Sequence, residues 1–122
     1  MALIRRDPTA EKKLEEYTAN DVKMTTTPIT ACELFKGAYR SGRREAEVKK
    51  VKGILTCLEL LNPSIDTCER YGKLVNELQL AGTPIGDLDT MIASLAITYN
   101  EPLLTSNRKH FERVSSLIVE TW

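Results

Sequence analysis

Apolar residues recur every three or four positions along two stretches of the chain, and this spacing predicts two long helices. From Ile65 to Leu80 the apolar positions are Ile65, Cys68, Tyr71, Val75 and Leu78. From about Asp87 to Tyr99 they are Leu88, Ile92, Leu95, Ala96 and Tyr99. We expect one face of each helix to pack against a core, and Ser64 to cap the first helix.

Shorter apolar segments bounded by turn residues predict strands. Val22 to Thr30 is rich in β-branched residues, and Ile54 to Leu61 has the apolar density of a strand that is buried on both faces. Leu103 to Thr105 and Leu117 to Val119 are two further short candidates.

Three more helices are predicted between these segments. Asp7 and Pro8 suit the N-cap and first position of a helix that ends near Ala19. A second helix runs from Ala31 to about Arg44, and a short one from Arg108 to Arg113. Strand alternates with helix along most of the chain, which predicts a single α/β domain over residues 1–122 with a mostly parallel sheet of four to five strands and helices on both faces.

Composition and charge narrow the chemistry. The 122 residues contain 17 Lys plus Arg and 17 Asp plus Glu, so a nucleic-acid contact would need a local basic patch rather than an overall excess. Three Cys without a CxxC pair and a single His argue against a disulfide framework and a zinc site, and predict free, buried thiols in a reducing cytoplasm. The apolar runs are too short for a membrane span.

Polar residues at predicted helix starts are the candidates for chemistry. Glu33 follows the strand that ends near Thr30, Asp89 lies in the first turn of the Asp87 helix, and Asn107 follows the Leu103 strand. Ligands of open α/β sheets bind beyond the carboxyl ends of the strands, and oxygen donors gathered there suit Mg²⁺ or Mn²⁺. Each residue also has a purely structural interpretation, because Thr30 to Glu33 matches a capping box, Asp89 favours the helix dipole, and Asn107 is a good N-cap.

Three segments, taken in order, resemble the PIN-domain ribonucleases of VapC type, the toxins of toxin–antitoxin pairs. The segments are Thr26-Thr27-Pro28-Ile29-Thr30-Ala31-Cys32-Glu33-Leu34-Phe35-Lys36-Gly37, Pro84-Ile85-Gly86-Asp87-Leu88-Asp89-Thr90-Met91-Ile92-Ala93-Ser94-Leu95-Ala96 and Pro102-Leu103-Leu104-Thr105-Ser106-Asn107-Arg108-Lys109-His110-Phe111. The resemblance implies a PIN-like three-layer α/β/α fold and a metal-dependent endoribonuclease. It assigns metal ligation and catalysis to Glu33 and Asp89, with Asn107 as a further ligand, acting directly or through water.

The resemblance also suggests accessory residues and partners. Asp87, Thr105 and Ser106 are possible accessory residues, and His110 has no partner in an obvious motif. The basic residues that would contact RNA if they gathered on one surface are Arg40, Arg43, Arg44, Arg108 and Lys109, with Arg5 and Arg6. The expected partners are an RNA substrate, an antitoxin that inserts a segment into the cleft, and a second copy of the chain.

The start of the chain departs from the family pattern. PIN domains open with a strand whose Asp is the first metal ligand, whereas the residues from Ala2 to Pro8 match only the segment that comes after that strand. We therefore expect an N-terminally truncated domain with weakened metal binding and little nuclease activity. The alternatives are a non-catalytic PIN-like module that binds RNA or an antitoxin, and a structural α/β domain whose polar residues are all helix caps.

Overall fold

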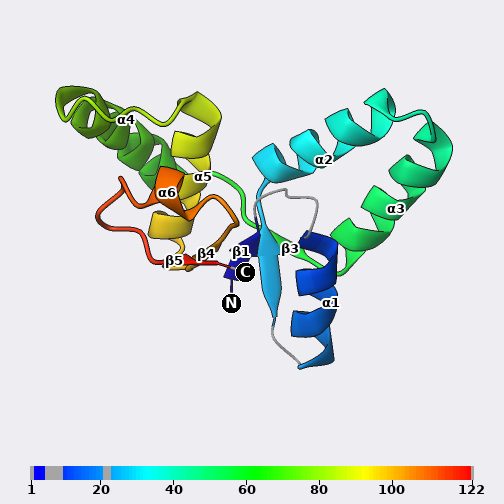
Figure 1. The fold of residues 1–122 in the computed structure, drawn as a ribbon. Helices are drawn as coiled ribbons and strands as arrows, with labels where there is room; N and C mark the ends of the chain where they lie inside the picture. The colour runs from blue at the N-terminus through cyan, green and yellow to red at the C-terminus, as the bar shows by residue number, and fades with distance from the viewer. Residues whose placement is uncertain (1, 5–9, 21–22, 122) are drawn as a thin grey trace.

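A five-stranded sheet, in which every described pairing is parallel, forms the centre of the computed structural model (Figure 1). The structure describes residues 2–4, 10–20 and 23–121. The strands lie in the order β3-β2-β1-β4-β5. Their bounds are Ala2–Ile4 for β1, Met24–Thr26 for β2, Glu59–Leu60 for β3, Leu103–Leu104 for β4 and Val119–Glu120 for β5. The predicted α/β class with a parallel sheet is confirmed.

Six helices connect the strands within the described residues. They are α1 (Ala10–Ala19), α2 (Pro28–Arg40), α3 (Arg44–Thr56), α4 (Ile65–Leu80), α5 (Asp87–Thr98) and α6 (Arg108–Phe111). Figure 1 shows α4, α5 and α6 on one side of the strands and α1 on the other, while α2 and α3 form a separate helical hairpin. No helix in the described ranges has the length and apolar character that a membrane span requires.

The first strand corrects one prediction. We expected the central strand to be missing, but Ala2–Ile4 pairs in parallel with β2 on one side and β4 on the other. Three residues suffice because a strand between two neighbours forms hydrogen bonds along both edges. Its sequence, Ala-Leu-Ile, contains no carboxylate, so this strand does not supply the aspartate of the family pattern. Asp7 and Pro8 lie outside the described residues.

The start of α2 corrects a second prediction. The strand expected over Val22 to Thr30 ends at Thr26, because Thr27 is the N-cap: its backbone is extended and its Oγ1 accepts a 3.1 Å hydrogen bond from the amide of Thr30. Pro28 then occupies the first helical position, where its missing N–H is not needed. Thr30 is therefore not the N-cap, and Glu33 is not the third residue of the helix.

The segment from Ile54 to Leu61 is mostly not a strand. The helix α3 continues to Thr56, and the strand β3 that follows is a short, exposed edge. The apolar density of the segment from Ile54 to Leu61 comes from the end of α3, where Ile54 and Leu55 are half-buried, and from Leu61, which is buried just after β3. A short apolar run does not distinguish a buried strand from a helix that is buried on one side.

The C-terminal half agrees closely with the prediction. Helix α4 has the predicted bounds, and Ser64 caps it in a capping box with Thr67. Helix α5, strand β4 and helix α6 also begin where they were expected, and β5 begins two residues later than predicted. The prediction fails for individual side chains, because Ile65 and Leu88 are 82% and 60% exposed and all three cysteines are exposed rather than buried.

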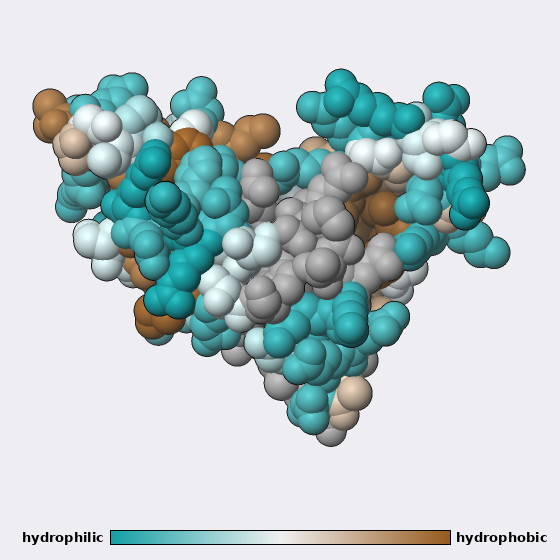
Figure 2. Space-filling model, in the orientation of Figure 1, coloured by the Kyte–Doolittle hydropathy of each residue, from teal (hydrophilic) through white to brown (hydrophobic). Residues whose placement is uncertain are grey.

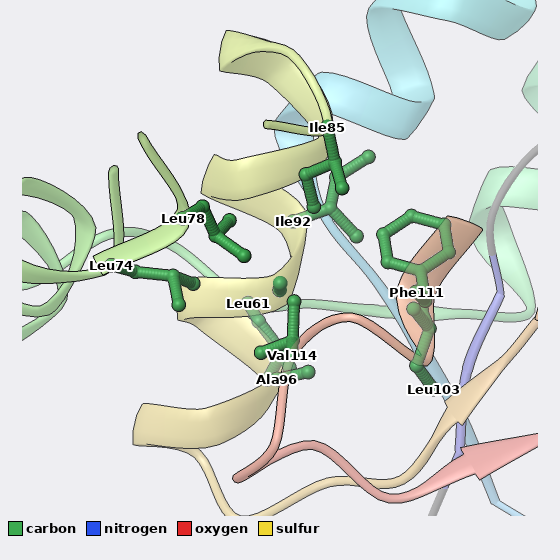
Figure 3. Packing of buried hydrophobic residues seen from close by; sticks show 10 residues of the cluster. Leu61, Leu74, Leu78, Ile85, Ile92, Ala96, Leu103, Phe111 and Val114 are labelled. Carbon is green, nitrogen blue, oxygen red and sulfur yellow. The ribbon is translucent and has the colours of Figure 1, made fainter. Parts of the chain in front are cut away.

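The main core lies between α4, α5, α6 and β4 (Figure 3). Its buried members include Leu74 and Leu78 of α4, Ile92 and Ala96 of α5, and Phe111 of α6. Ile92 and Phe111 have no exposed surface, so α5 and α6 are held against each other by close packing. This packing fixes the positions of the polar residues at the start of α5 and around α6.

Candidate functional site

Asp89 is a buried carboxylate in the first turn of α5. It is only 8% exposed, and it follows Gly86, the N-cap, whose φ of 95° is strained for any residue with a Cβ. The unpaired amides of a helix N-terminus favour a negative charge at this place. The side chain also lies 3.4 Å from Nε2 of His110, measured to Oδ2. The fold therefore holds a carboxylate at a place where its charge is favoured.

Glu33 lies in the second turn of α2, half-buried, with its Oε1 atom screened from solvent. It lines a groove of about 470 Å³ between α2 and the start of α5. The groove residues are Pro28, Ile29, Cys32, Glu33, Lys36, Gly37, Arg40 and Leu88. Figure 2 shows the surface hollowed between the α2–α3 hairpin and the α4–α5 side, with apolar atoms near the start of α5. Because Glu33 is past the first turn, the capping interpretation does not apply to it.

The loop after β4 organises the third candidate. Thr105 is buried, and its Oγ1 accepts a 3.0 Å hydrogen bond from the amide of Asn107. Asn107 occupies the N-cap position of α6 without a capping bond, and its Nδ2 lies 3.1 Å from Nδ1 of His110. Ser106 is exposed between them. The side chain of Asn107 is thus directed to His110, which the capping interpretation does not explain.

His110 is the residue that sequence reasoning missed. Besides Asp89 and Asn107, its ring contacts the backbone oxygen of Ile85, with Nε2 at 2.8 Å. The Asn107 to His110 spacing of three positions on a short helix was the one available signal. The contacts to Ile85 and Asp89 cross more than twenty positions of sequence, so only the fold reveals them.

Asp87 lies apart from this network, at the interface between α4 and α5. Its carboxylate accepts a hydrogen bond from the phenol of Tyr71 in α4. Partial burial, and then the charge and hydrogen bond of Asp87, raise the pKa of Tyr71 above its usual range. The structure therefore gives Asp87 a clear role in joining two helices, and its accessory role in chemistry stays a prediction.

The predicted basic residues divide between separate places. Arg40 lines the groove with Glu33, together with Lys36, a residue that no sequence motif singled out. Arg44 donates a hydrogen bond to the backbone oxygen of Tyr39 and lines a different cavity of about 350 Å³. The remaining basic residues lie elsewhere. Arg43 is the N-cap residue of α3, Arg108 is paired with Glu112 at 2.7 Å, and Lys109 is exposed on α6. Arg5 and Arg6 lie outside the described residues.

The oxygen atoms of the candidate site are of the type that a hard divalent cation prefers, but there are few of them. Glu33 and Asp89 offer carboxylate oxygens from α2 and α5, two helices that contact each other, and Asn107 adds an amide oxygen. Over the residues that the structure describes, no three His, Cys, Asp or Glu side chains are grouped to hold a metal ion. The side chains present thus fit Mg²⁺ or Mn²⁺ by type, as a partial ligand set.

Comparison with known proteins gives a consistent result over nearly the whole chain. Residues 1–117 match the PIN domain family. Ribonuclease VapC2 of Rickettsia felis is 34% identical over 98% of this chain and 89% of its own length, and the tRNA(fMet)-specific endonuclease VapC of Salmonella typhimurium is 32% identical over 88% and 82%. The crystal structure of VapBC2 from Rickettsia felis bound to a promoter DNA fragment superposes with a TM-score of 0.85 at 30% identity, covering 100% of this chain and 99% of that one.

Proposed function

Because this chain belongs to the PIN-domain family, we propose that it is a metal-dependent endoribonuclease that hydrolyses RNA phosphodiesters. The observation that carries the proposal is the buried carboxylate of Asp89 at the N-terminus of α5, beside the helix whose Glu33 lines the groove. The two curated relatives named above are ribonucleases, which supports the same activity.

Glu33 and Asp89 are the residues that would hold Mg²⁺ or Mn²⁺ directly. Such an ion supplies an activated water and neutralises charge on a phosphodiester. The chain itself contributes two carboxylates in fixed places. The charge of Asp89 is favoured by the dipole of α5, and Oε1 of Glu33 in α2 is screened from solvent. Since the described part offers only a partial ligand set, we expect weak metal binding, with a dissociation constant above about 10⁻⁶ M by calorimetry.

The groove beside Glu33 supports an RNA substrate. Lys36 and Arg40 follow Glu33 by three and seven positions on the same helix, and all three line the groove. At a rise of about 1.5 Å per residue, the two cations lie about 4.5 and 10.5 Å further along the helix axis. Cations spaced in this way can contact successive phosphates of a single strand that runs along α2 from the carboxylate.

The proposed partners are an antitoxin protein and a second copy of the chain. The solved relative is a VapBC2 structure, which supports a protein partner for this chain as well. A non-catalytic binding module is the second candidate, and two observations favour it: the net charge of zero and the lack, among described residues, of a three-residue cation cluster.

Cleavage assays on single variants test the proposal. Asp89→Asn should abolish Mg²⁺- or Mn²⁺-dependent cleavage of RNA, and an initiator tRNA is a suitable first substrate because one relative is named for it. Asp66→Asn is the matched control, since Asp66 is an exposed carboxylate in the first turn of α4. Chelation by EDTA should stop cleavage by the unmodified chain.

Three outcomes would count against the nuclease. Asp89→Asn could cleave at the rate of the unmodified chain, or EDTA could leave cleavage intact. The chain could also bind RNA without cutting it at any metal concentration, and this last result would favour the binding module.

A further inference from the structure

His110 connects the loop after β4 to the first turn of α5. We propose that it is a positioning residue, which holds the carboxylate of Asp89 in one orientation and through which Asn107 acts. The inference rests on the proposed function, because it assigns a role within the same site.

The ring makes three contacts that together fix its orientation. Nε2 lies 2.8 Å from the carbonyl oxygen of Ile85, and since a carbonyl only accepts, this nitrogen carries the hydrogen. The same nitrogen is 3.4 Å from Oδ2 of Asp89, so the ring also contacts the carboxylate. On the other side of the ring, Nδ1 accepts from the amide Nδ2 of Asn107 at 3.1 Å.

Core residues hold both ends of this network in place. Phe111, the neighbour of His110, is completely buried, and its ring centroid lies 5.5 Å from that of His110. Ile85, whose carbonyl receives the Nε2 hydrogen, is 6% exposed and belongs to the same core. The imidazole is therefore placed by packing on two sides, and it can act as a fixed support for a carboxylate.

The contacts also change how Asn107 is understood. Its side-chain amide is directed to His110. In metal sites, a partner that orients a ligating carboxylate typically affects metal affinity or activity by about 10- to 100-fold when it is removed. Asn107 would then influence Asp89 through the imidazole, as a further member of the same network.

Magnetic resonance tests the contacts without relying on activity. His110 is the only histidine in the chain, so a sample with ¹⁵N-labelled histidine gives one set of ring signals. Asp89→Asn and Asn107→Ala should each shift the ring nitrogens, whereas Glu112→Gln, an exposed change on the residue just after α6, should not. Mg²⁺ should shift the ring signals saturably, and Asp89→Ala should remove that response. An Asp89→Asn spectrum with unchanged ring nitrogens overturns the proposal.

Kinetics test the positioning role. His110→Phe keeps a ring against Phe111 but removes both nitrogens, and it should lower kcat by about 10- to 100-fold while KM for RNA stays within about twofold. His110→Gln, which can still donate a hydrogen bond, should recover part of the loss. Because Asn107 acts through the ring, His110→Phe combined with Asn107→Ala should be no slower than His110→Phe alone.

The outcomes separate this inference from the proposed function. A His110→Phe enzyme with the kcat of the unmodified chain overturns the positioning role, as does a double variant whose losses multiply. An Asp89→Asn variant that still cleaves RNA contradicts the nuclease instead. In that case the response of the ring to Asp89→Asn still decides whether the imidazole and the carboxylate are in contact.

Discussion

The two cations that line the groove with Glu33 give the most informative test of how this chain holds RNA. Lys36 and Arg40 are exposed residues of α2, so replacing each by Ala, singly and together, removes a charge with little effect on packing. We expect each replacement to weaken RNA binding and to reduce its dependence on salt concentration, because a cation that contacts a phosphate releases a condensed counterion.

The size of the effect depends on the number of contacts. For single-stranded nucleic acid each phosphate contact adds about 0.7 to the slope of log affinity against log salt, so the two residues together account for about 1.4. Between about 50 and 200 mM salt this difference amounts to about a sevenfold greater loss of affinity in the parent chain than in the double variant. Each single variant should lie about halfway between the two.

Binding is best measured by fluorescence anisotropy in the Asp89→Asn background, so that the RNA stays intact. Lys52→Ala is the matched control, since Lys52 is an exposed cation that lines the separate cavity beside Tyr39. A control that lowers the salt slope as much as Lys36→Ala would refute the argument, because it would mean that charge in general, rather than the groove, binds the RNA. A double variant with the slope of the parent would also refute it.

Two further predictions concern the helices that carry the site. Thr27→Ala should cost about 1 kcal/mol of stability, or roughly 3–5 °C in Tm, because it removes the cap of α2, whereas Thr27→Ser should keep most of it; equal melting of Thr27→Ala and the parent would show that the helix is not capped there. The raised pKa of Tyr71 stabilises the folded state below about pH 10, the ordinary tyrosine range, and this contribution is lost as the pH rises through the folded pKa. The free energy of unfolding, measured with urea, should therefore fall more steeply above about pH 10 for the parent than for Tyr71→Phe. If the two curves of unfolding free energy against pH run parallel, the contact with Asp87 is contradicted.

Local signals were sufficient for most of the C-terminal half of the fold. The spacing of Leu78, Ile92 and Ala96 predicts helices that bury one side, and Ser64 marks the start of α4. In the N-terminal half the same kind of reasoning failed, because its signals are ambiguous. Pro28 suits both the end of a strand and the first position of a helix, and only the extended backbone of Thr27 shows which applies.

The candidate site was predictable in its residue types and only partly in its connections. Glu33, Asp89 and Asn107 were predicted from helix starts and from three ordered motifs, and their roles stay a prediction. His110 was missed, because its contacts with Ile85 and Asp89 depend on the packing of α6 against α5. Lys36 was missed for a similar reason, since a lysine on a helix acquires meaning only from the groove that it lines.

The sequence alone determined the alternation of strand and helix and the parallel sheet, and it predicted the residue types of the candidate site, because periodicity, caps and donor types are properties of neighbouring residues. The tertiary structure decided that Ala2–Ile4 is a central strand, that Glu33 borders a groove with Lys36 and Arg40, and that an imidazole joins Asp89 to Asn107. The physical reason is that hydrogen bonds and packing between distant segments depend on where the whole chain places them, and the pattern of a local segment contains no record of its distant partners.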